Sequence, residues 1–491
     1  MRQQLRTALE ANERSLAEIA LLRAENESLR GENESLANRV ARLEAELRAD
    51  SSTTGKPPSS DPIGPRKKRA ERRAEARAEK RKPGKQPGAP GRNLERRETT
   101  VPDVEHRPAC CKSCGSDLAG AEVLGKEIRQ VIDLPPVVPV VTDHVAYKLR
   151  CSCGAETTAD FPPEARAPVC FGLEVRSFAV YLLDRQHLPI ERTAELLEDL
   201  LGVKVSTGWR CKVRREAAGE LTGFLAWLKD CLRKEPVVHA DETGTAVLTK
   251  KHWAHTLTTR LFTLLAVHPK RGVEAMKAIG VLPGYRGTVV HDGCASYGKF
   301  PRAKHAQCNA HAVRHVRAAG EAEAFSPWSE AMTRILLDAK FTSEAAASAG
   351  HRRVAPGRAE AIRAAYRKAL DDIFALLPDG PPPPRRQQAG QWAEAQRKAW
   401  NVATRLRDEE DQFLRCLEDT RVAWDNNVAE RALRMLKLHD EISGPFHSLD
   451  AAEAFMKTRS YLQTAANHGQ NMLGALRMLF TTGAWYPGPA G

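Results

Sequence analysis

The chain has 491 residues, long enough for several domains, and its hydrophobic content of 42% allows at least one large core. The formal net charge of +13 is uneven, because residues 66–97 hold 14 Lys and Arg against 4 Glu and so carry +10 of it. No stretch resembles a signal peptide or an apolar span of about 18 residues. We therefore expect a soluble, cytoplasmic protein whose basic block binds a polyanion.

Residues 1–49 carry a heptad pattern. Leucines recur at every seventh position, the d position of the heptad: Leu22, Leu29, Leu36 and Leu43. The other core position, a, is apolar or Asn: Ile19, Asn26, Asn33, Val40 and Leu47. This pattern is typical of a leucine zipper, in which buried Asn fixes the register of a parallel dimer. The alternative is a single amphipathic helix packed on its own domain. We expect a homodimer, or a higher assembly built on it.

Residues 50–107 form a predicted linker. Residues 50–65 are rich in Ser, Thr, Pro and Gly, and the basic block follows. The block ends in a Pro- and Gly-rich stretch (82–92) that suits neither helix nor strand. An extended basic segment of this kind is suited to DNA phosphates, although solvated disorder explains the composition equally well.

Four of the 11 Cys are clustered at metal-ligand spacing, as Cys111-Lys112-Ser113-Cys114-Gly115 and Arg150-Cys151-Ser152-Cys153-Gly154. A Gly after each pair permits the tight turn of a zinc knuckle, and four thiolates suit structural Zn²⁺. Cys110 is an alternative to Cys111, and reduced thiols without metal are the alternative to a zinc site. Apolar runs between the pairs, within 126–149, predict the strands of a zinc-ribbon-like module.

Residues 170–220 are predicted to be helical. Val175–Leu183 and Pro189–Leu201 have apolar residues at helical spacing, a turn follows at Gly202, and Ser206 or Thr207 caps a basic helix that runs through Arg215. The order suggests a helix-turn-helix, although any small helical bundle gives a similar pattern.

From residue 236 the pattern changes to strands. We predict strands at 236–241, 252–259, 261–268, 287–292 and 304–308, with a helix at 272–279. Three strands, a helix and a fourth strand form the start of an RNase H-like fold. Residues 311–423 are largely Ala, Arg and Leu and predict a helical insertion, and further helices are expected at about 449–466 and 471–480.

The fold class predicted is thus multidomain α+β. Its expected parts are a leucine-zipper coiled coil (1–49), a disordered basic linker (50–107), a zinc-binding module (108–166), a helical, helix-turn-helix-like DNA-binding domain (167–235), and an RNase H-like α/β catalytic domain (236–491) with a helical insertion at about 312–423.

Three carboxylates are the candidate catalytic residues. Asp241 and Asp292 each follow a short apolar strand, and Glu430 lies at the start of a predicted helix. Strand-end acids point into the crevice where open α/β sheets bind ligands, and carboxylates hold Mg²⁺ or Mn²⁺. For either Asp alone, a turn at the strand end is an alternative. Glu430 also fits a capping box with Asn427 as the cap.

Basic residues share the Glu430 helix. Arg434 and Lys437 lie on the Glu430 face, and we expect these two and Arg431 to contact DNA. His305, Cys308 and His311 form a further cluster of ligand-type residues. A structural role is favoured because the spacing matches no closed four-ligand site, and the alternatives are a second metal or an active-site role for His311.

Four motifs carry a resemblance to a known family. They are Asp241-Glu242-Thr243, then Asp292-Gly293-x-x-x-Tyr297, then His305-x-x-Cys308-x-Ala310-His311-x-x-Arg314, then Asp425-Asn426-Asn427-x-x-Glu430-Arg431-x-Leu433-Arg434. With the Cys pairs and the zipper in the same order, nearly the whole chain resembles the insertion-sequence-66 family of DDE transposases. Departures follow the last motif. His439-Asp440-Glu441 stands where a Lys- and Arg-rich stretch is expected, and Ser443-Gly444-Pro445-Phe446-His447-Ser448 has His447 where the family string Ser-Gly-x-Phe-Arg-Ser has Arg.

The resemblance implies a catalytic triad of Asp241, Asp292 and Glu430 on Mg²⁺, with Cys111, Cys114, Cys151 and Cys153 on Zn²⁺. It also implies a bacterial, nucleoid-associated enzyme that cuts terminal inverted repeats and joins the 3′-OH to target DNA, with accessory proteins encoded beside it. The alternatives are a catalytically decayed, dimeric zinc-containing DNA-binding regulator and a structure-specific nuclease on the same fold.

Overall fold

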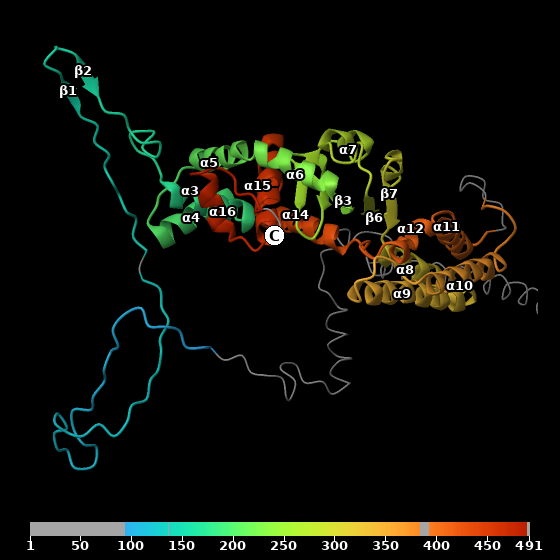
Figure 1. Cartoon of the computed structure of the whole chain (residues 1–491), viewed down its shortest axis with the longest axis horizontal. Coiled ribbons are helices and arrows are strands. Elements are labelled where there is room, and N and C mark those ends of the chain that lie inside the picture. Colours follow the sequence, from blue (N-terminus) through green and yellow to red (C-terminus); the bar gives the residue numbers. More distant parts are fainter. Residues whose placement is uncertain (1–93, 136, 383–391, 489–491) are drawn as a thin grey trace, which may run out of the picture. The chain divides into compact units, whose positions relative to one another are not determined.

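The computed structural model describes residues 94–135, 137–382 and 392–488 (Figure 1). The chain divides into two compact units, Ile63–Pro139 and a second that comprises Met1–Pro62 and Val140–Gly491. The predicted coiled coil (1–49), and the linker and basic block as far as residue 93, lie outside the described residues.

In the first unit, residues 94–135 and 137–139 contain an isolated β-bridge between Cys110 and Asp117 and otherwise neither helix nor strand. The bridge closes a tight turn, in which the Gly115 amide donates to the Cys111 carbonyl at 2.9 Å. Gly115 has a φ of +76°, a backbone conformation that Gly adopts without strain. The predicted knuckle turn after the first Cys pair is therefore confirmed.

The second unit begins with a short hairpin of β1 (Lys148–Arg150) and β2 (Glu156–Thr158). Its turn contains the second Cys pair, and Gly154 takes a φ of +85°. The prediction of strands across 126–149 is wrong for the described residues 126–135 and 137–147. Pro135 and Pro139 lack the N–H that a sheet ladder needs, and the apolar side chains here, such as Val131 and Val140, are exposed.

Helices follow the hairpin. They are α3 (Leu173–Val180), the π-helix η2 (Tyr181–Arg185), α4 (Ile190–Leu201), α5 (Thr207–Glu220) and α6 (Thr222–Lys234). The turn and cap expected between α4 and α5 are confirmed. Gly202 ends α4 with a φ of +63°, and the Ser206 hydroxyl accepts a hydrogen bond from the Trp209 amide at 3.2 Å.

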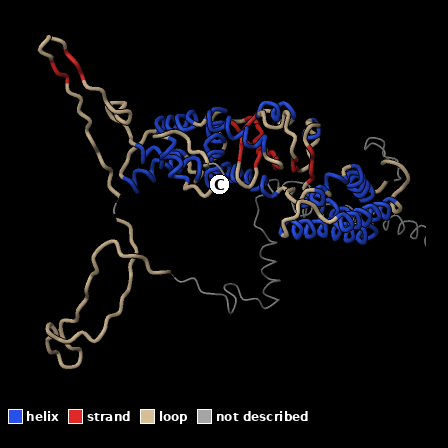
Figure 2. The backbone as a smooth tube through the Cα atoms, in the orientation of Figure 1, coloured by secondary structure: helices blue, strands red, loops and turns tan. Residues whose placement is uncertain are grey.

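The described residues also form a five-stranded mixed sheet with the order β5-β4-β3-β6-β7 (Figure 2). Its strands are β3 (Val237–Val247), β4 (Lys250–Thr258), β5 (Thr263–His268), β6 (Thr288–His291) and β7 (Lys304–Gln307), with α7 (Val273–Ile279) before β6 and the 3-10 turn η3 (Tyr297–Lys299) after it. β3, β4 and β5 pair antiparallel, whereas β6 pairs parallel with both β3 and β7. The predicted strands and helix are all present.

The segment after β7 is purely helical. Its elements are α8 (Asn309–Ala319), η4 (Glu323–Phe325), α9 (Ser326–Ser348), α10 (Pro356–Phe374), α11 (Glu394–Asp408), α12 (Glu410–Phe413) and α13 (Arg415–Glu418). These helices have a hydrophobic core of their own, with Trp328, Met332 and Tyr366 fully or almost fully buried. The helical character expected for this stretch is confirmed in its described part.

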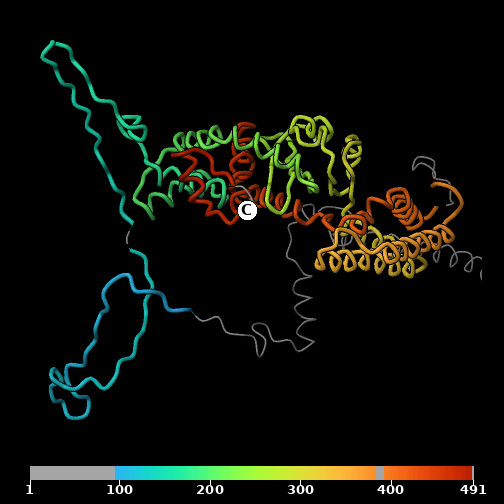
Figure 3. Tube along the Cα trace, in the orientation of Figure 1, coloured from blue at the N-terminus to red at the C-terminus, as the bar shows by residue number. Residues whose placement is uncertain are grey.

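The chain ends in α14 (Asn427–Ser443), α15 (Leu449–Asn467) and α16 (Met472–Leu479). α14 packs on β3 and β4, and α15 packs on β5 and α5. C-terminal helices therefore lie beside α3 and α5, although about 250 residues separate them (Figure 3). Phe224, Val238 and Tyr461 meet in the shared core. In the described residues, no helix is both long enough and apolar enough to span a membrane.

Candidate active site

Asp241 and Asp292 come from neighbouring parallel strands. The β3–β6 ladder pairs Val237 with Thr288 and ends at His239 and Val290. Continuing that register by two residues sets Asp241 opposite Asp292, on the same face of the sheet, because paired residues of adjacent parallel strands point the same way. Adjacent strands are about 4.8 Å apart, so this register would bring the two carboxylates close together. The Asp292 charge does raise the pKa of Asp241, after the larger effect of burial.

The sequence suggested that Asp241 ends its strand, but in the structure it does not. β3 continues to Val247 because its antiparallel pairing with β4 extends beyond the point where the parallel pairing with β6 stops. Asp241 therefore lies inside β3, at the edge where β6 leaves the ladder. Asp292 does follow the last residue of its strand, and its Oδ1 accepts a hydrogen bond from the Cys294 amide at 3.0 Å.

The pKa of Asp241 indicates that Glu430 lies near it. Burial raises the pKa of Asp241 well above its usual value, and the charges of Asp292, Glu242 and Glu430 raise it further. Burial also raises the pKa of Glu430, and the Asp292 charge adds to that effect while Arg314 and Arg434 oppose it. The three predicted acids thus lie within electrostatic range of one another.

Asn426 connects the Glu430 helix to the Asp241 strand. Its fully buried side chain contacts His239 Nδ1 through its Oδ1 at 3.0 Å and donates from Nδ2 to the Ala240 carbonyl at 2.9 Å. These bonds fix the first turn of α14 beside the residue that precedes Asp241. The sequence motif contained Asn426, but its pattern gave no indication of this partner 186 residues away.

The capping-box explanation of Glu430 is wrong. The cap of α14 is Asn426, and the Asn427 amide is bonded to Asp425 Oδ1 at 3.1 Å. Glu430 Oε1 is buried and has no hydrogen-bond partner among the described residues. A buried carboxylate oxygen without a partner is costly, and it fits a group that binds a cation.

Glu242 follows Asp241 in β3, and side-chain alternation predicts that it points to the opposite face. Its side chain is fully buried and accepts hydrogen bonds from Tyr297 Oη at 2.7 Å and from Arg271 Nε at 2.9 Å. Burial raises the pKa of Glu242, and the Asp292 charge also raises it. Because Tyr297 belongs to the turn after Asp292, these bonds tie that turn to β3.

Arg405 reaches the same turn from the helical insertion. Its Nη2 donates to the Asp292 carbonyl at 3.2 Å and to Gln307 Oε1 at 2.8 Å. Gly293 has a φ of +93°, and a Cβ added there would lie 1.5 Å from Arg405 Nη2. The close approach therefore requires Gly at 293. Sequence reasoning did not identify Arg405, since no local pattern marks it.

The His305, Cys308 and His311 cluster separates in space. His305 Nδ1 contacts His291 Nε2 at 3.2 Å, and its own Nε2 faces the Phe300 carbonyl. His311 instead lies beside Glu430, with 3.8 Å between His311 Nε2 and Glu430 Oε1. Burial lowers the pKa of His311 to about 4, so its imidazole is neutral at physiological pH. The three residues therefore do not form one site, and His311 lies at the candidate active site.

The residues expected to contact DNA differ in exposure. Arg431 and Arg434 are exposed on α14, whereas Lys437 is half-buried and donates to the Gly244 carbonyl at 3.2 Å. Of the departures from the family motif further along α14, His439 and Asp440 are buried or half-buried, whereas Glu441 is exposed. His439 is buried and stacks on Phe446 with 4.3 Å between ring centroids, and Asp440 accepts from the Thr245 hydroxyl at 3.4 Å.

The carboxylate site and the candidate zinc cysteines differ in donor chemistry. Asp241, Asp292 and Glu430 offer only oxygen, which suits a hard divalent cation such as Mg²⁺. The candidate zinc cysteines lie in separate units, and each pair occupies a Gly-containing turn. The Ser116 hydroxyl lowers the pKa of Cys114 to about 7, and the Cys153 backbone lowers the pKa of Cys151. Both shifts favour the thiolate that binds Zn²⁺.

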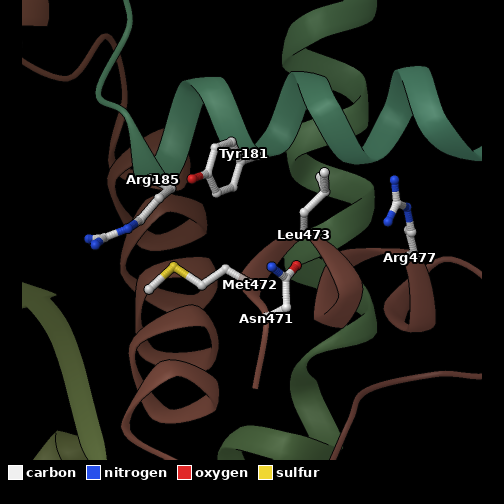
Figure 4. A pocket seen from close by; sticks show the side chains of 6 residues that line it. All are labelled: Tyr181, Arg185, Asn471, Met472, Leu473 and Arg477. Carbon is white, nitrogen blue, oxygen red and sulfur yellow. The ribbon is translucent and has the colours of Figure 1, made fainter. Parts of the chain in front are cut away.

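An open pocket of about 540 Å³ lies elsewhere, between η2 and α16 (Figure 4). Its lining comprises Tyr181, Arg185, Asn471, Met472, Leu473 and Arg477. It contains none of the residues that the sequence predicted for the site, and Arg477 is already paired with Glu174 at 2.7 Å. The pocket is therefore separate from the carboxylate site.

Comparison with known families agrees with this geometry. The model of the transposase IS66 family matches residues 169–454, more than half of the chain. The model of the zinc-finger binding domain of these transposases matches residues 108–154, and that of a family of unknown function matches residues 8–95. No curated protein matches the chain. The chain thus has the zinc-finger domain of these proteins, and it belongs to the IS66 family of transposases, which are nucleic-acid-processing enzymes.

Proposed function

We propose that this transposase cleaves the ends of its insertion sequence and joins the resulting 3′-OH to target DNA, with Asp241, Asp292 and Glu430 as its catalytic triad. The observation that carries the proposal is geometric: the β3–β6 register leads toward Asp241 and Asp292 on neighbouring strands, and the Asn426–Ala240 hydrogen bond holds the first turn of the Glu430 helix beside Asp241. Burial raises the pKa of Asp241, and the charges of Asp292 and Glu430 raise it further, which agrees with this placement. The strand order β5-β4-β3-β6-β7 supports an RNase H-like catalytic domain around them.

The carboxylates of Asp241, Asp292 and Glu430 would hold two Mg²⁺ or Mn²⁺ ions. Bound cations of this kind lower the pKa of the attacking water and stabilise charge on the phosphodiester. The unpartnered Oε1 of Glu430 supports the assignment, since a buried acceptor without a donor is available to a cation.

The protein's own groups orient the acids. Asn426 holds α14 against β3, and Arg405 and Tyr297 hold the turn after Asp292. All three use hydrogen bonds to buried or half-buried partners, which restrict the carboxylates before a substrate arrives. Water then attacks the phosphorus at the element end and displaces the 3′ oxygen, which leaves as the free 3′-OH. That 3′-OH attacks a phosphorus of target DNA and displaces a 3′ oxygen of the target strand, and no covalent enzyme intermediate is required.

The remaining regions would bind DNA and metal. We assign Zn²⁺ to Cys111, Cys114, Cys151 and Cys153, with Cys110 as the alternative to Cys111. The zinc finger, the α3–α6 helices, the basic block and the exposed Arg431 and Arg434 would hold terminal inverted repeats and target DNA. The zipper would join two subunits so that both ends are cut in one complex. Lys437 would contribute less than the two arginines, because it is bonded to Gly244.

A supercoiled plasmid with candidate element ends tests the proposal. Asp292→Asn should retain DNA binding in a gel-shift assay and lose cleavage in Mg²⁺, because the amide keeps the shape of the side chain but not its charge. Asp241→Asn and Glu430→Gln should behave alike. Glu441→Gln is the matched control, since Glu441 is an exposed acid on the same helix as Glu430, and it should cleave like the wild type.

The outcomes separate the three functions. Cutting by Asp292→Asn at the wild-type rate would remove Asp292 from the site. Wild-type protein that binds the ends but never cuts would indicate a DNA-binding regulator. Cutting without joining to a second DNA would indicate a nuclease.

A further inference from the structure

A sulfur, a nitrogen and an oxygen atom that could each bind a metal lie close together beside Glu430 of the candidate active site. The thiol of Cys308, one imidazole nitrogen of His311 and one carboxylate oxygen of Glu430 lie within 4.8 Å of one another. Cys308 is the cap residue of α8 and His311 lies in its first turn, whereas Glu430 comes from α14, more than 110 residues later. Two helices that are remote in sequence thus present their ligand atoms to one point.

Two of the three side chains, Glu430 and His311, each have a polar atom without a hydrogen-bond partner. Glu430 Oε1 and His311 Nδ1 are both buried and have no hydrogen-bond partner within the described residues. The 3.8 Å between His311 Nε2 and Glu430 Oε1 is too long for a hydrogen bond. Leaving buried polar atoms unpaired is costly. A cation between the two side chains would satisfy Glu430 Oε1 and bind one imidazole nitrogen of His311.

Burial raises the pKa of the Cys308 thiol to about 12, and the backbone N–H groups of His311 and Asn426 oppose that rise, so the thiolate needs a cation beside it. Cys308 is buried, and its Sγ accepts a hydrogen bond from the Asn426 amide at 3.2 Å. Backbone N–H groups that point at a sulfur stabilise its negative charge, as they do at helix N-termini. The same Asn426 holds α14 against β3, so the position of the sulfur and that of Glu430 are fixed together.

The donor set selects the ion. Sulfur and imidazole nitrogen are poor ligands for Mg²⁺, which prefers oxygen, whereas Zn²⁺ accepts Cys, His and Glu together. Three protein ligands leave a fourth position of a tetrahedral site open to water. We propose that Cys308, His311 and Glu430 form a site for Zn²⁺ or a cation of similar softness, distinct from the zinc finger.

One consequence rests on the proposed function. If Glu430 binds the catalytic Mg²⁺ ions, a Zn²⁺ ion bound to Glu430, Cys308 and His311 competes with Mg²⁺ for that carboxylate. Zn²⁺ at this site therefore inhibits cleavage, and a higher Mg²⁺ concentration relieves the inhibition. The site would make the enzyme sensitive to free zinc.

Cobalt binding tests the site without DNA or activity. Co²⁺ replaces Zn²⁺ at such sites, and a thiolate bound to it gives a charge-transfer absorption in the near ultraviolet. Titrations of the full chain are compared for the wild type, Cys308→Ser and Cys416→Ser. Cys416 is the matched control, because it is equally buried but lies in α13, outside this cluster. Any signal from the zinc-finger cysteines is common to all three proteins and cancels in the differences.

The expected result is a thiolate–cobalt absorption that Cys308→Ser loses and Cys416→Ser keeps. His311→Gln should need at least about tenfold more Co²⁺, since lost ligand support typically costs 10–100-fold in affinity. Identical spectra for the wild type and Cys308→Ser would overturn the site. If circular dichroism shows that Cys308→Ser is unfolded, His311→Gln decides, and unchanged Co²⁺ affinity in that variant overturns the site equally.

The inhibition is tested separately. Plasmid cleavage by the wild type is measured against Zn²⁺ at several Mg²⁺ concentrations, and the half-inhibiting Zn²⁺ concentration should rise with Mg²⁺. A value independent of Mg²⁺ would overturn the competition for Glu430 while the cobalt result stands. A chain that binds Co²⁺ through Cys308 but never cleaves DNA would refute the proposed function and leave the metal site intact.

Discussion

The Asp241 carboxyl group is surrounded by acids, so its charge is unfavourable in the folded protein without metal. Burial and the neighbouring Asp292, Glu242 and Glu430 raise its pKa. A carboxyl group whose pKa is raised on folding contributes stability below its unfolded pKa, and that contribution is lost as pH rises through the folded value. A tenfold change in an acid dissociation constant on folding corresponds to about 1.4 kcal/mol of stability.

Asp241→Asn should therefore stabilise the protein when Mg²⁺ is absent. At pH 8 we expect the free energy of unfolding to rise by at least about 1 kcal/mol, with little change at pH 4, where the wild-type carboxyl is protonated. Thermal unfolding at both pH values measures the difference. Asp199→Asn, an exposed change in α4, is the control and should have no effect. A variant less stable than the wild type at pH 8 would contradict the electrostatic argument.

Sequence reasoning at this scale located the acids but not the groups that orient them. A strand followed by Asp is a local pattern, so Asp241 and Asp292 were predictable. Asn426 and Arg405 act through hydrogen bonds to Ala240 and Asp292, which lie more than 100 residues away in the sequence. No periodicity carries such a pairing, and the rival capping role for Glu430 was removed only by the observed bond from the Asn427 amide to Asp425.

Among the elements, the strands and most helices were predictable because apolar periodicity is strong in buried segments. β3 is longer than expected, since the β3–β4 pairing extends past the parallel pairing with β6. The expected strands in 126–149 failed for the opposite reason. Apolar β-forming residues between prolines do not make a strand unless a partner strand supplies the hydrogen bonds, and Val131 and Val140 are exposed.

The link between α11 and the Asp292 turn predicts that the helical insertion sets the geometry of the site. Arg405→Ala removes the hydrogen bonds to the Asp292 carbonyl and to Gln307. Hydrogen bonds to charged groups are worth about 1.5–3 kcal/mol, so we expect cleavage to fall by about 10–100-fold. The Mg²⁺ concentration for half-maximal rate should also rise, which a general loss of stability would not produce.

Arg407→Ala is the matched control on the same helix, because Arg407 is half-exposed and bonded to the adjacent Asp408 at 2.9 Å. It should cleave like the wild type, and Arg405→Lys should recover part of the activity by keeping the charge. A wild-type Mg²⁺ dependence in Arg405→Ala would show that the insertion does not orient Asp292.

For the whole molecule, one hydrophobic core extends from the α3–α6 helices through the sheet to the C-terminal helices. Residues that sequence reasoning expected in a DNA-binding segment and a catalytic segment therefore pack together, as Phe224, Val238 and Tyr461 do. Such joint packing depends on tertiary contacts and is invisible in local patterns. The helices of the insertion have a separate core, which the change of composition at 311–423 had indicated.

The heptads of residues 1–49 lead to a prediction about assembly. Leu29→Ala with Leu36→Ala removes two core leucines from each helix of the predicted zipper. Buried Leu→Ala changes typically cost about 2–5 kcal/mol each, so the dimer should dissociate to monomers in multi-angle light scattering. Ser28→Ala with Ser35→Ala, one position before each leucine and outside the seam, should leave the dimer intact.

If the zipper joins the subunits that hold the two element ends, the leucine variant will still bind one end in a gel shift but will not form the complex containing two. A leucine variant that stays dimeric would transfer the subunit contact to another region of the chain, and a monomer that still pairs the ends would separate end pairing from the zipper altogether.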